Sequence, residues 1–294
     1  MMALADFQEK HLPVVEKELL NFLQEQTSEP ILLEAMNYSV KAGGKRLRPL
    51  LLLAVVAGFQ KEITTGAYQT AAALEMIHTY SLIHDDLPAM DDDTLRRGQA
   101  TNHVVYGEAL AILAGDGLLT EAFHLLSRAQ VPASEKLLLL QLLAEKAGAK
   151  GMVAGQVADI QGEGQQLDLA GLAAIHRRKT GDLLTFSLLA GGILAQQDPA
   201  VLTVLEQLAQ HVGLAFQIRD DLLDVVATPE EVGKTTGHDA VAGKNTYPGL
   251  LGLEGAKKAL AAELAQASGK LTTMSQEYAF DTSLLQELLA KFEM

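Results

Sequence analysis

The chain has 294 residues, with 37 acidic and 23 basic side chains and a formal net charge of −14. This acidic excess argues against nucleic acid as a partner, because proteins that bind the phosphate backbone need a basic face. The sequence contains no cysteine, which excludes disulfides, thiolate metal sites and cysteine nucleophiles. Hydrophobic residues make up 48% of the chain and aromatic residues 5%, which favours aliphatic cores between packed helices.

The amino-terminal segment, residues 1–10, lacks the basic start and apolar core of a signal peptide. No uninterrupted apolar run approaches the roughly 18 residues that a membrane-spanning helix needs. We therefore expect a cytoplasmic protein without a membrane span.

Apolar residues recur at spacings of three and four along most of the chain, which is the period of an amphipathic helix. Strand signals are poor, because no alternation of apolar and polar residues is sustained. The expected helices cover residues 4–25, 30–42, 49–59, 65–86, 107–128, 134–149, 170–177, 182–195, 199–226, 248–267 and 282–293. The sequence therefore predicts an all-α fold, in which residues 1–294 form one large helical bundle around a central cavity.

A first group of acidic residues, Asp85, Asp86 and Asp91, follows the expected helix 65–86. Its six-residue step from Asp85 to Asp91 does not fit one helical face. Pro88 has no backbone N–H and interrupts a helix, so the second half of the motif can turn back toward the first.

A second group, Asp220, Asp221 and Asp224, lies within the expected helix 199–226. Positions 220 and 224 share one helical face, with position 221 beside them. Clustered carboxylates repel one another and raise each other's pKa unless a hard cation neutralises them. Two such groups, both with basic residues nearby, predict a two-sided Mg²⁺ clamp on a diphosphate.

The breaks between helices combine glycine with basic residues, in Gly43-Gly44-Lys45-Arg46, Lys179-Thr180-Gly181, Gly233-Lys234 and Gly243-Lys244. Flexible glycine backbone beside a cation suits the close approach of a phosphate group. The pattern therefore favours an anionic ligand in spite of the net negative charge.

These motifs carry a resemblance. Gly-Gly-Lys-Arg-Leu-Arg-Pro, Asp-Asp-x4-Asp followed by Leu-Arg-Arg-Gly, Lys-Thr-Gly, and Phe-Gln-Ile-Arg-Asp-Asp-x2-Asp occur here in the order typical of trans-isoprenyl diphosphate synthases. Over residues 30–255 the chain resembles that family, and within it the bacterial farnesyl diphosphate synthases. The resemblance implies an isoprenoid-synthase bundle, a homodimer, and three Mg²⁺ ions per active site, with Mn²⁺ as an alternative ion.

The resemblance also implies roles for single residues. The expected metal ligands are Asp85, Asp86, Asp91, Asp220, Asp221 and Asp224. The allylic diphosphate is expected to contact Arg96, Lys179, Lys234 and Lys244. Isopentenyl diphosphate is expected to contact Lys45, Arg48, His78 and Arg97, whereas Arg46 is expected to be exposed. The groups expected to face the developing allylic cation are the Lys179 carbonyl, Thr180 and Gln217.

The helix that leads into Asp85 is expected to line the cavity for the growing hydrocarbon tail. At 1.5 Å per residue, Tyr80 and Ser81 lie roughly 6–8 Å below that aspartate. The family's rule makes an aromatic residue at position 80 the mark of a C15 product.

Three alternatives stay open at this point. Geranyl and geranylgeranyl diphosphate synthases share the same chemistry and differ only in product length. A terpene cyclase needs no second diphosphate site, and Lys45, Arg48 and Arg97 count against it. A non-catalytic regulatory subunit of a longer-chain synthase would be expected to lose one aspartate motif, and this chain keeps both.

Overall fold

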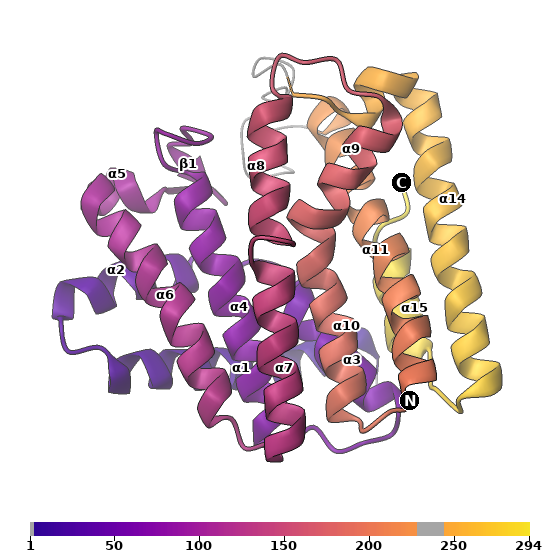
Figure 1. Ribbon diagram of the computed structural model, residues 1–294, viewed down its shortest axis with the longest axis horizontal. Helices are drawn as coiled ribbons and strands as arrows, with labels where there is room; N and C mark the ends of the chain where they lie inside the picture. Colours follow the sequence, from indigo (N-terminus) through magenta and orange to yellow (C-terminus); the bar gives the residue numbers. More distant parts are fainter. Residues whose placement is uncertain (1–2, 228–243) are drawn as a thin grey trace.

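The structure, a computed structural model, describes residues 3–227 and 244–294. It is a bundle of long helices with one two-stranded hairpin (Figure 1), which confirms the predicted all-α class. Its elements are α1 (Leu4–Gln26), α2 (Pro30–Lys41), α3 (Leu47–Gly58), α4 (Thr65–Asp85), β1 (Leu95–Arg96), β2 (Gln99–Ala100), α5 (Asn102–Tyr106), α6 (Glu108–Arg128), α7 (Ala133–Ala147), α8 (Met152–Gly162), α9 (Leu169–His176), the π-helix η1 (Arg177–Gly181), α10 (Asp182–Leu194), α11 (Pro199–Val226), α14 (Tyr247–Glu277) and α15 (Ser283–Ala290).

The predicted helices are present, but three features differ from the prediction. Helix α8 and the short α5 lie in segments that were not expected to be helical, and α14 runs on to Glu277. Gly155 and Gly162 weaken the helical signal of α8, because glycine is a poor helix former. Packing against its neighbours therefore decides that this segment is a helix.

Helices α3, α4 and α10 pack on one another in the middle of the bundle. In α3 the consecutive residues 50–56 are all buried, which marks a helix enclosed on every side. A Cβ at Gly191 of α10 would lie 2.6 Å from the Leu52 carbonyl oxygen, so this glycine permits close contact between α10 and α3. Outer helices cover this centre, with α1 and α6 on α4 and with α11 on α10.

The first aspartate motif begins at the carboxyl-terminal end of the central helix α4, and the second lies at the carboxyl-terminal end of the outer helix α11. Helix α4 ends at Asp85, and the second motif occupies the last two turns of α11. The hairpin β1–β2 follows α4 and lies at the same end of the bundle (Figure 1). A helix carboxyl terminus carries partial negative charge, which favours cations over further carboxylates. Both motifs are therefore placed where a positive partner is stabilising.

Helix α6 meets the length and composition requirements of a membrane span, although no such segment was expected. Among the helices of the described residues, it alone is long and apolar enough, with a mean hydropathy of 1.4 over an 18-residue window. In the fold, 39% of that window is buried, and α6 packs against α4. A single such helix is weak support for a membrane span, because core helices pass the same test.

Candidate active site

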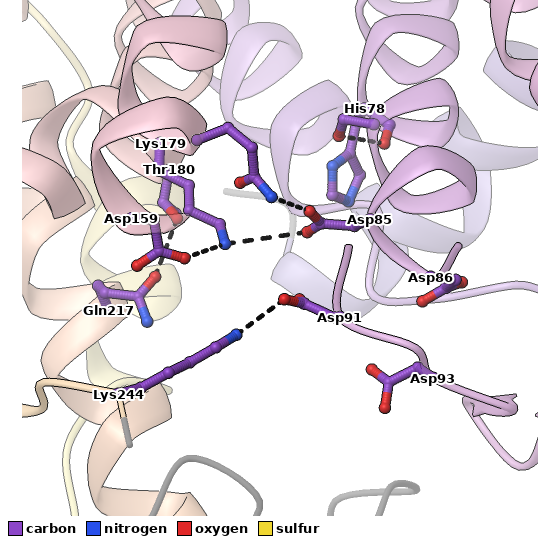
Figure 2. Close-up of polar contacts among 12 residues, drawn as sticks. His78, Asp85, Asp86, Asp91, Asp93, Asp159, Lys179, Thr180, Gln217 and Lys244 are labelled. Carbon is purple, nitrogen blue, oxygen red and sulfur yellow. Dashed lines mark hydrogen bonds and ion pairs between the residues drawn. The ribbon is translucent and has the colours of Figure 1, made fainter. Parts of the chain in front are cut away.

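The first aspartate motif folds back on itself. The backbone N–H of Asp91 donates to the carbonyl oxygen of Asp85 at 2.9 Å, so the chain reverses after α4, as the Pro88 break predicts. The Asp85 carboxylate points toward Lys179, and the Asp91 carboxylate points toward Lys244 (Figure 2). The two carboxylates therefore face the opposite wall of the site.

Lys179 lies between carboxylates from two helices. Its Nζ atom is 2.6 Å from Asp159 Oδ2 of α8 and 4.0 Å from Asp85 Oδ2 (Figure 2). The Gln156 side-chain amide, one turn before Asp159, donates to Asp85 Oδ1. Lys244 makes a similar contact nearby, because its Nζ atom lies 3.0 Å from Asp91 Oδ1. Lys179 and Lys244, two of the predicted diphosphate-binding lysines, thus lie beside the predicted metal ligands Asp85 and Asp91.

Burial and these ion pairs shift the pKa values of Asp85 and Asp91 in opposite directions. Burial raises the pKa of Asp85 to about 6, although Lys179 opposes the shift. Burial also acts to raise the pKa of Asp91, but Lys244 and Lys179 outweigh it and the pKa is lowered. The pKa of Lys179 is raised, because Asp85 and Asp159 outweigh the effect of its burial. The raised pKa of Lys179 keeps its ammonium charged in this buried position.

The segment that carries Lys179 and Thr180 is the π-helix η1, where the sequence predicted a break between two helices. Two glycines bring neighbouring helices close to it. A Cβ at Gly155 of α8 would overlap the backbone of Lys179, and one at Gly213 of α11 would lie 2.8 Å from the Gly181 Cα. A π-helix inside an α-helix often marks a functional site.

Thr180, Gln217 and Asp221 form one hydrogen-bonded chain. The Thr180 hydroxyl donates to Gln217 Oε1 at 2.9 Å, and Gln217 Nε2 donates to Asp221 Oδ1 at 3.0 Å. The other Asp221 oxygen accepts from the Tyr247 backbone N–H at 3.0 Å and lies 3.4 Å from His176 Nε2. Asp221 is itself buried. These hydrogen bonds fix the orientation of the Gln217 amide, with its oxygen toward Thr180 and its nitrogen toward Asp221.

The other aspartates of the second motif differ in exposure. Asp224 is buried, and its Oδ1 atom accepts no hydrogen bond from the described residues. Asp220 is half-buried and takes part in further interactions. A buried carboxylate oxygen without a donor costs stability unless a ligand supplies the missing charge, which suits a metal ligand or its neighbour.

Asp86 and Arg96 neutralise each other. Arg96 Nε lies 2.7 Å and 2.9 Å from the two Asp86 carboxylate oxygens. Asp86 lies apart from the space between Asp85, Asp91 and the two lysines (Figure 2). The roles of Asp86 as a metal ligand and of Arg96 as an allylic diphosphate contact stay predictions.

The residues predicted to bind isopentenyl diphosphate gather around the turn before α3. Arg48 Nη1 lies 3.2 Å from His78 Nε2 of α4, and Arg97 Nη1 donates to the Gly43 carbonyl oxygen. Gly44 has a φ of +126°, and a Cβ there would lie 2.5 Å from the Arg97 guanidinium. Lys45 is exposed beside them. Burial and Arg48 hold the pKa of His78 well below its usual range, so its ring is neutral.

The expectation for Arg46 is wrong, because its side chain is buried. It pairs with Glu75 and Glu16 beneath the turn. The sequence pattern gave no signal for this, since neither glutamate is near Arg46 in the chain. Long-range packing alone brings the three side chains together.

Tyr80 and Ser81 take different surroundings on α4. Tyr80 is buried and packs edge-on against the His84 ring, with centroids 5.7 Å apart. Burial raises the pKa of its hydroxyl to about 12. The Ser81 hydroxyl donates to the His78 carbonyl oxygen at 2.9 Å. The role of Tyr80 and Ser81 as the floor of the tail cavity stays a prediction. Lys234, which was predicted to contact the allylic diphosphate, lies outside the described residues.

Sequence reasoning missed two polar residues of the site, Gln156 and Asp159. Both lie on α8, the helix that the prediction omitted, and both face Asp85 and Lys179. Their three-residue spacing, followed by Gly162, was an available signal for a polar helix face.

The carboxylates that could hold Mg²⁺ are Asp85, Asp91, Asp220 and Asp224. In the part of the chain that the structure describes, no three acidic or histidine side chains are close enough to hold a metal by themselves. This fits Mg²⁺, which uses one or two carboxylates together with substrate phosphates and keeps several waters. The paired lysines fit the same ion with a diphosphate, and so does the buried Asp224 oxygen, which accepts no hydrogen bond within residues 3–227 and 244–294.

The fold and the site define a class: an all-α protein in which the aspartates that follow α4 face two lysines and a second aspartate group ends α11, with a separate arginine and histidine group. Residues 29–281 match the polyprenyl synthetase family, and the chain belongs to that family. It is 48% identical over 273 residues to the farnesyl diphosphate synthase of Geobacillus stearothermophilus, with 92% of each protein covered. It is also 48% identical to the farnesyl diphosphate synthase of Bacillus subtilis, with 86% of each covered.

A solved structure shows the same fold. It is that of a geranyltransferase from Helicobacter pylori complexed with magnesium and isoprenyl diphosphate. The two chains are 36% identical with a TM-score of 0.83, and 96% of each is covered. Geranylgeranyl pyrophosphate synthase of Capsicum annuum is 51% identical, but over 79% of this chain and 63% of that protein.

Proposed function

We propose that this chain is a farnesyl diphosphate synthase, and that residues 1–294 form one domain for that activity. The reaction is the Mg²⁺-dependent head-to-tail condensation of isopentenyl diphosphate with dimethylallyl or geranyl diphosphate, with release of diphosphate. One observation carries the proposal. Lys179 and Lys244 pair with Asp85 and Asp91, and a second basic group around Arg48, His78 and Arg97 lies beside them. Two anion-binding groups are needed to bring two diphosphate substrates together.

The first group binds the allylic diphosphate. Diphosphate leaves readily only when its charge is neutralised, so preorganised cations supply most of the rate enhancement. When bound, Mg²⁺ supplies part of that neutralisation, held by Asp85, Asp91, Asp220 and Asp224. The lysines then turn from the carboxylates to the phosphate oxygens. The raised pKa of Lys179 keeps it charged, and a charged ammonium in a buried site is a strong electrostatic partner for a phosphate.

Thr180 and Gln217 act on the allylic cation that remains. The Thr180 hydroxyl donates a hydrogen bond to Gln217 Oε1, which leaves the oxygen lone pairs of the hydroxyl free to face the cation. Neutral dipoles suit a carbocation, because a carboxylate at the same place could capture it. The alkene of isopentenyl diphosphate then forms the new carbon–carbon bond, and the released diphosphate accepts the proton that is lost.

Three Mg²⁺ ions per active site, with Mn²⁺ as a substitute, and a cytoplasmic location belong to the same proposal. Metal content in the presence of a non-reactive allylic diphosphate analogue tests the number of ions. Replacement of Mg²⁺ by Mn²⁺ in the activity assay tests the substitute.

A product assay tests the reaction. Purified protein receives isopentenyl diphosphate with either allylic starter, with and without Mg²⁺, and the dephosphorylated alcohols are separated by chain length. We expect Mg²⁺-dependent farnesol from both starters. A longer or shorter alcohol would support the condensation mechanism but contradict the predicted C15 product length. The folded protein producing no alcohol would favour the non-catalytic subunit instead.

We further propose that the chain forms a homodimer through the surface of α5, α6, α7 and α8. These helices contact one another in sequence and expose large apolar side chains, which are Val104, Val105, Ile112, Leu113, Leu137, Leu138, Val153, Val157 and Ile160. Clustered exposed apolar side chains of this size mark interaction surfaces. Light scattering after size exclusion should give twice the mass of the chain. Leu113→Glu, which places a charge at an exposed apolar position of α6, should give monomer.

A further inference from the structure

Arg46 holds an unusual backbone conformation for its residue type. It precedes α3 with a φ of 45° and a ψ of 40°, in the left-handed region. A side chain with a Cβ is disfavoured there, so surrounding contacts must hold the conformation. The Arg46 side chain is 5% exposed, although the turn lies at the edge of the bundle.

Three contacts fix this side chain to three different helices. Its Nη1 atom donates to Glu75 Oε1 of α4 at 2.7 Å, and its Nε atom donates to Glu16 Oε1 of α1 at 3.1 Å. Its Nη2 atom donates to the carbonyl oxygen of Val40, near the end of α2. The guanidinium is planar with donors in fixed directions, so three acceptors determine its orientation. The turn is therefore fastened to the body of the fold through Arg46.

Helix α4 fixes two arginines of the same turn. Glu75 holds Arg46 inside the fold, and His78, three residues later on the same helical face, lies 3.2 Å from Arg48. Lys45, next to Arg46, is left exposed at the surface of the turn. Because the Arg46 side chain is held inside the fold, the backbone of the turn directs the adjacent Lys45 side chain outward.

Glu75 is also a counter-charge for the arginine group. Burial acts to lower the pKa of Arg46, Arg48 and Arg97, and the Glu75 carboxylate opposes this at all three. Glu75 is buried, and its Oε2 atom accepts no hydrogen bond from the described residues. A buried carboxylate with one oxygen unpaired contributes little to the stability of a fold. The presence of a charged Glu75 at this buried position therefore needs a reason other than stability.

We propose that the buried pair Arg46–Glu75 is a positioning element, which holds Lys45, Arg48 and Arg97 in the arrangement that binds the diphosphate of isopentenyl diphosphate. The inference rests on the proposed function for the identity of this anion. Neither residue of the pair needs to touch the substrate, because each acts through the turn and its neighbours. Their loss should affect the homoallylic substrate and spare the allylic one.

The test uses a pair of apolar replacements. The double variant Arg46→Met with Glu75→Met removes both charges together, so that neither remains buried and unpaired, and such replacements often keep stability. Misplacement of a binding group by about 1 Å can cost up to about a hundredfold. We expect the Kd for isopentenyl diphosphate, measured by calorimetry, to rise at least about tenfold. The KM for geranyl diphosphate should change less than about twofold.

Two further variants complete the experiment. Arg46→Lys keeps the charge and the Glu75 pair but loses the fork of donors, and should bind isopentenyl diphosphate with intermediate affinity. Glu263→Gln removes the negative charge from the 2.7 Å His211–Glu263 contact between α11 and α14, and this variant should bind isopentenyl diphosphate like the wild type. Circular dichroism establishes that each variant is folded.

The outcomes separate this inference from the proposed function. If the wild type fails to bind isopentenyl diphosphate, the proposed function is wrong. If the wild type binds and the folded double variant binds equally well, the pair is only structural and this inference is overturned. Equal losses for both substrates would also overturn it. If the double variant does not fold, the Arg46→Lys variant decides the question. Wild-type affinity of that variant for isopentenyl diphosphate would overturn this inference.

Discussion

Lys244 and Asp91 lie 3.0 Å apart, although 153 residues separate them in the chain. Lys179 makes the equivalent contact with Asp159 at 2.6 Å and lies 4.0 Å from Asp85. In both cases a lysine ammonium lies beside an aspartate of the first motif, which follows α4. The site therefore presents positive and negative groups that can separate when a diphosphate with its metal enters between them.

Asp159 should matter through Lys179. Asp159→Asn keeps the shape of the side chain but removes the charge that holds the lysine, so Lys179 should move toward Asp85. We expect the KM for the allylic diphosphate to rise about tenfold, which corresponds to one buried charge-assisted contact. Steady-state kinetics with each substrate varied in turn measure this. An allylic KM within twofold of the wild type would show that Asp159 does not position Lys179.

Gly155 should be required by the π-helix. A Cβ at this position overlaps the Lys179 backbone, so Gly155→Ala should lower both the melting temperature and kcat. Gly269 of α14 is the matched control, because a Cβ there meets nothing within 4 Å. Gly269→Ala should raise stability by about 0.5–1 kcal/mol through helix propensity. Thermal denaturation and kcat of the two variants check both expectations, and equal behaviour would contradict them.

Tyr80 and Ser81 should set product length. Tyr80→Ala removes a buried ring from α4 and should deepen the cavity, which allows geranylgeranyl diphosphate to form. Ser81→Phe should fill the cavity and shift the product toward geranyl diphosphate. Chromatography of the dephosphorylated products measures both. An unchanged C15 product from both folded variants would place the cavity floor elsewhere.

Mg²⁺ affinity should depend on pH through Asp85. Its pKa of about 6 in the metal-free site lies above the usual value for aspartate, because burial disfavours the charged form. Below that pH a proton must leave before a cation can bind, so the apparent Mg²⁺ affinity should fall as the pH drops through 6, approaching about tenfold per unit. Activity against Mg²⁺ concentration at pH 5.5, 6.5 and 7.5 is the measurement. Asp85 has no such role if the half-saturating Mg²⁺ concentration stays constant over this range.

The two aspartate motifs illustrate what local pattern can predict. The four-residue step from Asp220 to Asp224 needs only the period of a helix, and the break after Asp85 needs only the properties of Pro88. The same local rules predict most helix positions, because apolar periodicity is repeated many times along the chain. They fail at α8, where Gly155 and Gly162 hide a helix that carries Gln156 and Asp159.

Arg46 shows the other limit. Its neighbours in the sequence give no reason for burial, and Glu16 and Glu75 lie 30 and 29 residues away. Only packing of α1 and α4 beneath the turn brings these acceptors within hydrogen-bonding distance. The same holds for Lys179 with Asp159 and for Arg97 with the Gly43 carbonyl.

The sequence by itself determined the helical class, the composition of the core, the two acidic motifs and the presence of basic groups beside glycines. These depend on periodicity and residue type, which are local properties. The tertiary structure alone decided which lysine faces which aspartate, that Asp86 is paired with Arg96, and that Arg46 is buried on Glu75. The Asp86–Arg96 pair follows from how the hairpin after α4 folds back on that helix. The lysine and Arg46 pairings follow from how segments far apart in the chain pack together, and helix packing is set by the summed fit of many side chains rather than by any short motif.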